Sequence, residues 1–111
     1  MNSVELESAF KSTLAEALHD HADMLKEARF NHCDTSEGPT LESSFGPGTF
    51  GAHEALDRAH LIRNTWADFM EDHPTILLHP ELFQHARVVG DLMDALYHEI
   101  GVLDERAPDE T

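Results

Sequence analysis

Imidazole and carboxylate side chains recur at helical spacing in this 111-residue sequence, which contains nine histidines. Asp57 and His60 are three residues apart, and Asp94 and His98 are four apart, so each pair would share one face of a helix. Carboxylate and imidazole pairs on facing helices hold the metal ions of di-iron and di-manganese bundles. The spacing therefore predicts one candidate metal site, formed by His53, Asp57, His60, Asp94 and His98.

The same histidines also fit a hypothesis without metal. Di-metal bundles use the Glu-x-x-His motif on two helices, but here one motif has Glu16 with His19 and the other has Asp57 with His60. Glu16 and His19 straddle an apolar face and need not point inward. The alternative is therefore that these histidines lie at the solvent-exposed edge of a helical core, and that the chain requires no cofactor.

A glycine-rich stretch, SFGPGTFGAHE, opens the helix that contains the first histidines. The free N–H groups at a helix N-terminus bind phosphate, but no GK[ST] follows this stretch, and Glu54 in the first turn would repel an anion. One hypothesis is a small anionic ligand, such as a nucleotide, held between subunits by Phe50, Arg58, Arg63 and Trp66. The alternative is a flexible entry to the helix.

No residue set predicts catalysis. Cys33 is the single cysteine and lies in no nucleophile signature, and HEALD departs from the metalloprotease motif because Asp57 replaces its second histidine. A lone cysteine also excludes an internal disulfide and favours a reducing compartment. The sequence has neither a signal-peptide pattern nor an apolar run of the roughly 18 residues that span a membrane. We therefore expect a cytoplasmic protein without enzymatic activity.

The net charge of −15, from 22 acidic and 7 basic residues, limits the possible partners. Such a surface repels phosphate backbones and anionic lipid headgroups, so direct binding to nucleic acids or membranes is disfavoured. The charge can serve solubility alone. Alternatively, the carboxylates imitate phosphates and occupy a basic groove on a protein partner.

Hydrophobic periodicity predicts an N-terminal helix over residues 1–30 and a Gly/Pro/Ser-rich connection over 31–50. A helix over 51–73 would follow, capped by Gly51 and stopped by Pro74. Its expected buried face consists of Ala52, Ala55, Ala59, Ile62, Trp66 and Phe69. A polar stripe borders that face and consists of His53, Asp57, His60, Asn64 and Glu71.

The corner PTILLH joins this helix to a last helix, which Pro80 begins and which runs to residue 103 before a polar tail over 104–111. The last helix has a coiled-coil-like seam of Leu82, Ala86, Val89, Met93, Leu96, Ile100 and Leu103. Residues 51–103 therefore predict an antiparallel helical hairpin in an all-α fold. Because the apolar face is too broad for one partner helix, we expect a homodimer or larger oligomeric bundle, with a monomeric three-helix bundle as the competitor.

The run HEALDRAH, the corner EDHPTILLHPEL and the ending LMDALYHEIG resemble a family of small helical-hairpin proteins of bacteria and their phages. The resemblance covers residues 50–103. It implies a compact accessory protein and no catalytic class.

These observations favour an acidic, non-enzymatic interaction protein of phage or bacterial origin that inhibits or sequesters a partner through its acidic surface. The alternative is a bundle that binds a metal or a small ligand, through the histidine-rich stripe or a pocket between subunits.

Overall fold

The chain is all-α, as a computed structural model that describes residues 2–32 and 38–106 shows. No strand occurs in these two ranges. The elements, in chain order, are α1 (Ser3–His32), α2 (Leu41–Phe45), α3 (Phe50–Trp66), the π-helical turn η1 (Ala67–Glu71), α4 (Pro74–Leu78) and α5 (Pro80–Glu105). The chain divides into two compact units, Met1–Leu41 and Glu42–Thr111. Cys33 and residues 107–111 lie outside the described residues.

The first unit is built on α1, in which no residue is buried. Asn2 begins the helix, because its side chain accepts a hydrogen bond from the backbone N–H of Glu5 at 2.9 Å. Ser3 is the first helical residue. Apolar side chains, including Leu14 and Leu18, are exposed along the helix.

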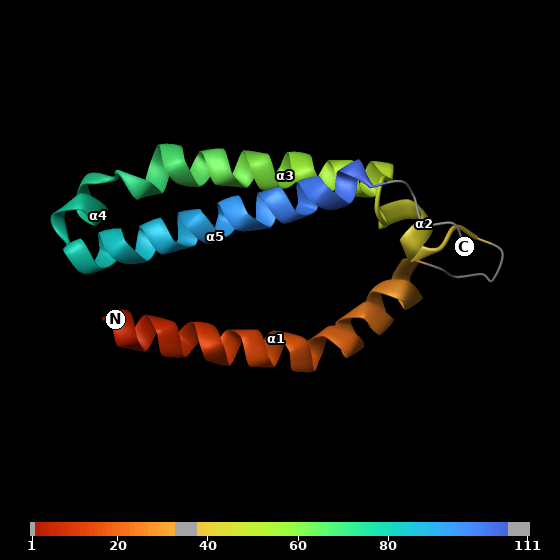
Figure 1. Ribbon diagram of the computed structural model, residues 1–111, viewed down its shortest axis with the longest axis horizontal. Helices are drawn as coiled ribbons and strands as arrows, with labels where there is room; N and C mark the ends of the chain where they lie inside the picture. The colour runs from red at the N-terminus through yellow and green to blue at the C-terminus, as the bar shows by residue number, and fades with distance from the viewer. Residues whose placement is uncertain (1, 33–37, 107–111) are drawn as a thin grey trace. The chain divides into compact units, whose positions relative to one another are not determined.

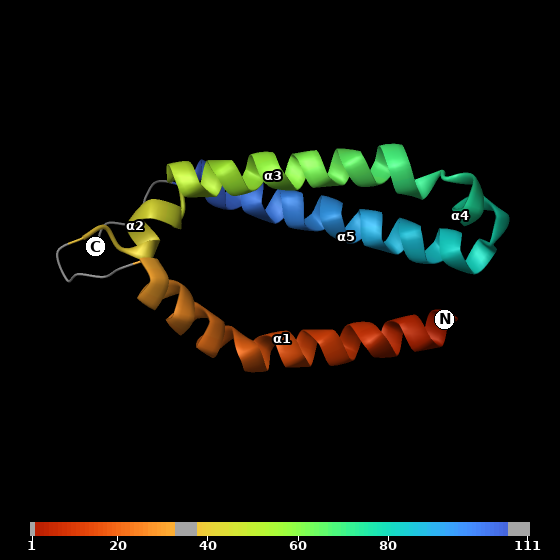
Figure 2. The same cartoon turned by 180° about the vertical axis from the view of Figure 1, so that it is seen from behind.

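The second unit is an antiparallel hairpin of α3 and α5, which lie side by side in both ribbon views (Figures 1 and 2). Residue pairs along the hairpin fix its register. His53 meets Asp104 at the open end, and His60 meets Tyr97 further along. Arg63 meets Asp94 nearer the corner. In this structure α3 and α5 thus run antiparallel, and α5 continues to Glu105, beyond the predicted end at residue 103.

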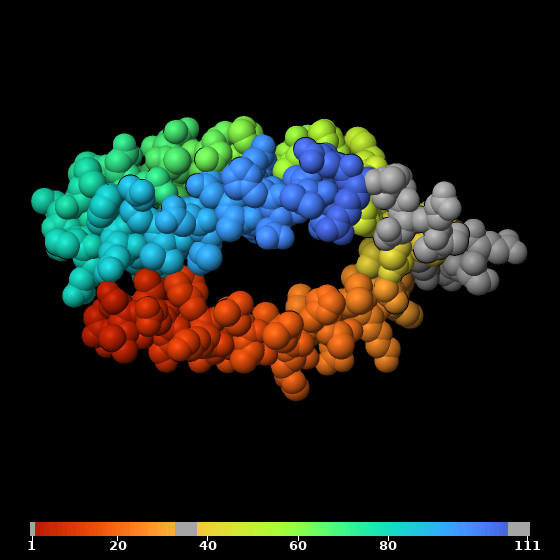
Figure 3. All heavy atoms as spheres, viewed as in Figure 1, coloured from red at the N-terminus to blue at the C-terminus, as the bar shows by residue number. Residues whose placement is uncertain are grey.

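Small residues bring α3 and α5 together. Ala52 and Ala86 are the buried apolar side chains of the described ranges, and Gly51 and Gly90 are buried as well. A Cβ on Gly90 would collide with the Glu71 carboxylate, and a Cβ on Gly101 would touch Leu56 at 3.7 Å. The close packing along the pair is visible in the space-filling view (Figure 3). The hairpin thus has a thin interface of small side chains in place of a wide apolar core.

The predicted buried face of the first hairpin helix is partly wrong. Ala52 is buried and Ala59 and Trp66 are half-buried, but Ile62 is 56% exposed and Phe69 is 69% exposed. Ala55 is exposed too. The reason is that a single facing helix covers only a narrow strip of α3, so the apolar residues at the edge of that strip stay uncovered.

The entry to α3 differs from the predicted one, because Thr49 and not Gly51 is the N-cap. The Thr49 hydroxyl accepts a hydrogen bond from the Ala52 N–H at 3.3 Å and donates one to the Gly46 carbonyl at 2.7 Å. Gly48 has a φ of 70°, a conformation that favours glycine, and its N–H donates to the Leu103 carbonyl at 3.1 Å. The predicted connection over 31–50 also contains the short helix α2.

The predicted helix over 51–73 is regular only as far as Trp66, after which η1 widens its last turn. A π-turn holds an extra residue, so it changes the direction of the side chains that follow. The corner is helical: Pro74 begins α4, and the His73 ring accepts a hydrogen bond from the Thr75 N–H at 3.1 Å. The short helix α4 contacts both η1 and α5.

Candidate functional site: the polar face of the hairpin

The hairpin has two chemically different sides. On α3, the polar stripe lies along one side of the contact with α5, and the exposed apolar residues lie along the other side. We call the first side the polar face, made of His53, Asp57, His60, Asn64, Glu71, Arg87, Asp94, His98 and Glu105. Two cavities open on it: Asn64, Glu71 and Asp94 line one, and His98 and Glu105 line the other.

The centre of the polar face is an ion pair between the Arg63 guanidinium and the Asp94 carboxylate. Each side chain is 39% exposed, so water screens the pair only partly. The guanidinium also lies 5.9 Å from the centre of the Tyr97 ring, within the range of a cation–π contact. Asp94 therefore holds an arginine, and its charge is largely neutralised.

Glu71 lies beside this pair and has no ion-pair or hydrogen-bond partner in the ranges that the structure describes. The π-turn η1 carries it against Gly90, where the absence of a Cβ makes room for the carboxylate. Glu71, Asn64, Arg63 and Asp94 surround a cavity of about 150 Å³, which is smaller than typical small-molecule sites of roughly 300–1,000 Å³. This cavity is too small for a nucleotide.

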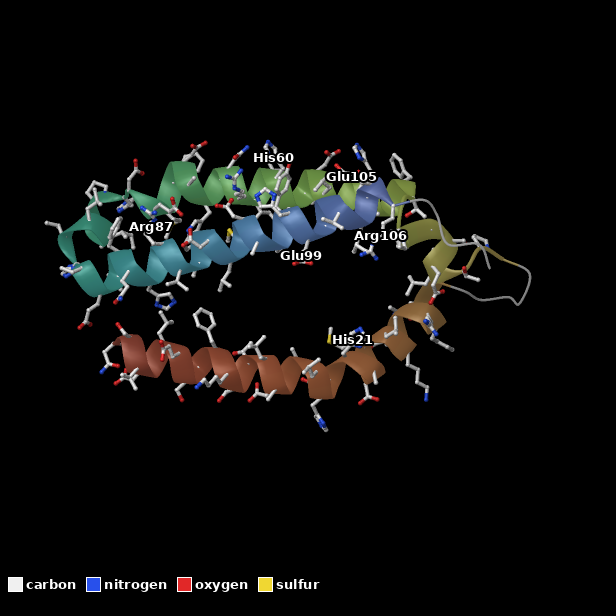
Figure 4. All side chains as sticks on the ribbon, viewed as in Figure 1. His21, His60, Arg87, Glu99, Glu105 and Arg106 are labelled. Carbon is white, nitrogen blue, oxygen red and sulfur yellow. The ribbon has the colours of Figure 1, made fainter. Side chains whose placement is uncertain are left out.

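A row of rings covers the middle of the polar face. His60, labelled on α3 in Figure 4, stacks at a tilt on Tyr97 with 5.5 Å between ring centres. The Tyr97 ring also meets the His98 ring edge-on, with 5.6 Å between the ring centres. The Asn64 amide nitrogen lies 3.0 Å from His60 Nε2. In the tautomer of His60 that has its proton on Nδ1, Nε2 accepts a hydrogen bond from this amide.

His53 joins α3 to α5 at the end of the hairpin that lies away from the corner. Its Nδ1 lies 3.0 Å from Asp104 Oδ2, and its Nε2 lies 3.7 Å from Asp57 Oδ2. The hydrogen bond to Asp104, with the nearby negative charge of Asp57, raises the pKa of His53 above its usual value. The imidazolium form of His53 thus ties the start of α3 to the end of α5.

The five residues of the predicted metal site do not converge. His53 approaches Asp57, but His60 and His98 stack on Tyr97 and Asp94 pairs with Arg63. Within residues 2–32 and 38–106, no group of three or more His, Cys, Asp or Glu side chains is placed to hold a metal ion.

The four residues of the predicted ligand pocket are also apart. Phe50 is exposed at the start of α3, and Arg58 forms an ion pair with Glu54 at 3.3 Å. The Trp66 indole N–H donates to the Ala86 carbonyl at 3.1 Å, which fixes the ring in the hairpin. Arg63 and Trp66 line different cavities on opposite sides of the interface.

Tyr97 and Asp104 contact the histidines of the polar face, yet no motif in the sequence selected them. Their partners are 37 and 51 residues away in the chain, as the numbers of His60 and His53 show. The signal that could have found them is the register of the hairpin, which pairs the start of α3 with the end of α5. That register was not fixed by the periodicity of either helix alone.

The opposite side is what we call the apolar face, formed by Ile62 and Phe69 from the first arm and by Leu92, Leu96 and Leu103 from α5. Ile62, Phe69, Trp66 and Met93 line an open cavity of about 450 Å³ on this side. Exposed apolar side chains thus gather on successive turns of two helices, and in proteins such a patch marks an interaction surface.

No family model, curated protein or solved structure matches the chain. None of the described helices is both long enough and apolar enough to span a membrane.

Proposed function

We propose that this chain is a small non-enzymatic interaction protein of bacterial or phage origin, which inhibits or sequesters a partner by binding its basic surface. It would act in the cytoplasm as a homodimer or larger homo-oligomer. The acidic polar face would meet the partner, and the apolar face would serve assembly.

The excess of carboxylates on the polar face carries this proposal. Arg63 is already paired with Asp94, and the only other arginine on this face is Arg87. Glu71 and Glu105 have no cation within ion-pair distance in the described part of the chain. Unpaired carboxylates on a rigid helical surface attract a basic partner over a distance set by salt screening.

Charge alone would also make the chain bind cations without specificity, so the test must separate the polar face from the total charge. The variant D57N/E71Q/E105Q removes three negative charges from the polar face. Its matched control, E16Q/D20N/E27Q, removes the same charges with the same kinds of substitution from α1.

The full-length chain is immobilised, exposed to a bacterial lysate and eluted with a salt gradient. We expect a basic protein that elutes as salt rises, is retained by the control and is lost from the polar-face variant. Equal capture by both variants, or a captured protein that salt does not release, would contradict the proposal.

A further inference from the structure

We propose that the apolar face is covered by a second copy of the same hairpin, in a two-fold dimer in which α3 of one copy packs on α5 of the other. The polar face would stay exposed on both outer sides. This assembly is a specific form of the proposed homo-oligomer and rests on that part of the proposed function.

The extent of the apolar face argues for a partner of the same length. The face runs from Phe69, beside the corner, to Leu103, at the open end, and it includes Leu96, which is 59% exposed. The first arm contributes Ile62 and Phe69 to it, and α5 contributes residues from Leu92 to Leu103. A two-fold axis brings the apolar faces of two copies together, so each copy covers the apolar side chains of the other.

The charges at the edges of the face select one arrangement. Arg58 lies one helical turn before Ile62, at the outer edge of the apolar face on α3. Glu99 lies between Leu96 and Leu103 in the sequence, at the outer edge on α5, and extends on the side of α5 away from α3 (Figure 4). Arg58 and Glu99 are therefore opposite charges on the two outer edges, beside Glu54 on α3 and Arg106 at the end of α5.

The register of the hairpin places Arg58 and Glu99 at the same position along the hairpin axis. Leu56 faces Gly101, with 3.7 Å between the leucine methyl and the position of a glycine Cβ, and His60 faces Tyr97. Arg58 lies midway between Leu56 and His60 in the sequence, and Glu99 lies midway between Tyr97 and Gly101. A two-fold axis parallel to the helices keeps each residue at its level, so Arg58 would meet the partner's Glu99 twice in each dimer.

The alternative axis, perpendicular to the helices, would stack α3 on α3 and α5 on α5. Arg58 would then face the other copy's α3 and could not pair with Glu99 on α5. In the single hairpin Arg58 pairs with Glu54, four residues earlier, and an exposed pair of this kind is weak enough to exchange for another. Charge complementarity therefore favours the parallel axis.

The first test compares one apolar substitution on each side of the full-length chain, by native mass spectrometry and sedimentation. We expect a dimer for the wild type. L96D should weaken it roughly 100-fold or more, because each dimer loses two buried leucines. The matched control is V102D, since Val102 is 53% exposed on the same helix but lines a cavity with His98 and Glu105 on the polar face. The control should remain a dimer.

The second test reads the register and does not depend on any variant being as stable as the wild type. R58E and E99R each place like charges at both edge contacts, and each should weaken its own homodimer by about tenfold. Mixed together, they should form heterodimers in preference to either homodimer, because the mixed pair restores two opposite-charge contacts. The double variant R58E/E99R should return to within about threefold of the wild type.

Three outcomes would overturn the inference. They are a wild type that stays monomeric at all concentrations, equal disruption by L96D and V102D, and heterodimers in merely statistical proportion. A monomer would point to coverage of the face by α1 or by another protein. The polar-face variant D57N/E71Q/E105Q should remain a dimer, so a failure of partner binding and a failure of dimerisation are distinguishable.

Discussion

His53 is the residue whose environment most clearly sets a measurable property. Its Nδ1–H donates a hydrogen bond to the Asp104 carboxylate across the hairpin, and its ring lies near Asp57 on its own helix. The charged imidazolium gains from both contacts, and its pKa is therefore above the usual 6.5. Because the pKa is higher in the folded chain, the contact stabilises the fold fully below the unfolded pKa. That stabilisation is lost as pH rises through the folded pKa.

Substitution of Asp104 by asparagine should lower the pKa of His53 toward its usual value, since it removes the hydrogen bond to a carboxylate and its charge. D57N should lower it by less, because Asp57 contributes only a weaker charge interaction. Titration of the His53 ring by NMR measures both effects. A His53 pKa that D104N leaves unchanged, or that D57N lowers more than D104N, would contradict the geometry of the open end.

The elements that the sequence predicted best are those with a local signal. The helix end before Pro74, the helix start at Pro80 and the long N-terminal helix all follow from periodicity and proline positions. The sequence could not show which edge of a broad apolar stripe would face the partner helix, so Ile62 was predicted to be buried. The π-turn η1 leaves no local signature either, and neither periodicity nor motifs predicted the Arg63–Asp94 pair.

Two glycines in the hairpin helices should respond to alanine in opposite directions. A Cβ on Gly101 would make an ordinary contact with Leu56, so G101A should stabilise the fold by roughly 0.5–1 kcal/mol through helix propensity. A Cβ on Gly51 would overlap the backbone of α2, with Phe45 Cα at 2.9 Å. G51A should destabilise the fold by roughly 1–3 kcal/mol, because backbone atoms must move.

Chemical denaturation of both variants measures these changes, and each variant is the control for the other because both are Gly-to-Ala changes in a helix. Stabilisation by G51A would mean that α2 does not pack against the first turn of α3.

At the scale of the whole molecule, charge and apolar surface are separated on the hairpin. Carboxylates gather on the polar face and at the outer edges, whereas Ile62, Phe69 and Leu96 lie together on the other side. The net charge of −15 opposes self-association, since two copies repel each other. The same charge favours a basic partner. The two proposed interactions should therefore depend on salt in opposite ways.

Raising ionic strength from about 0.02 M to about 0.5 M shortens the screening distance from roughly 20 Å to a few ångströms. Repulsion between two copies then falls while apolar burial persists, so the homodimer should tighten by roughly three- to tenfold. R58E adds negative charge to each copy, so its homodimer should tighten more than that of the wild type over the same range. Sedimentation equilibrium across the salt series measures the dissociation constants of the wild-type and R58E homodimers. A wild-type dimer that weakens steadily with salt would show that charge contacts, and not the apolar face, hold the two copies together.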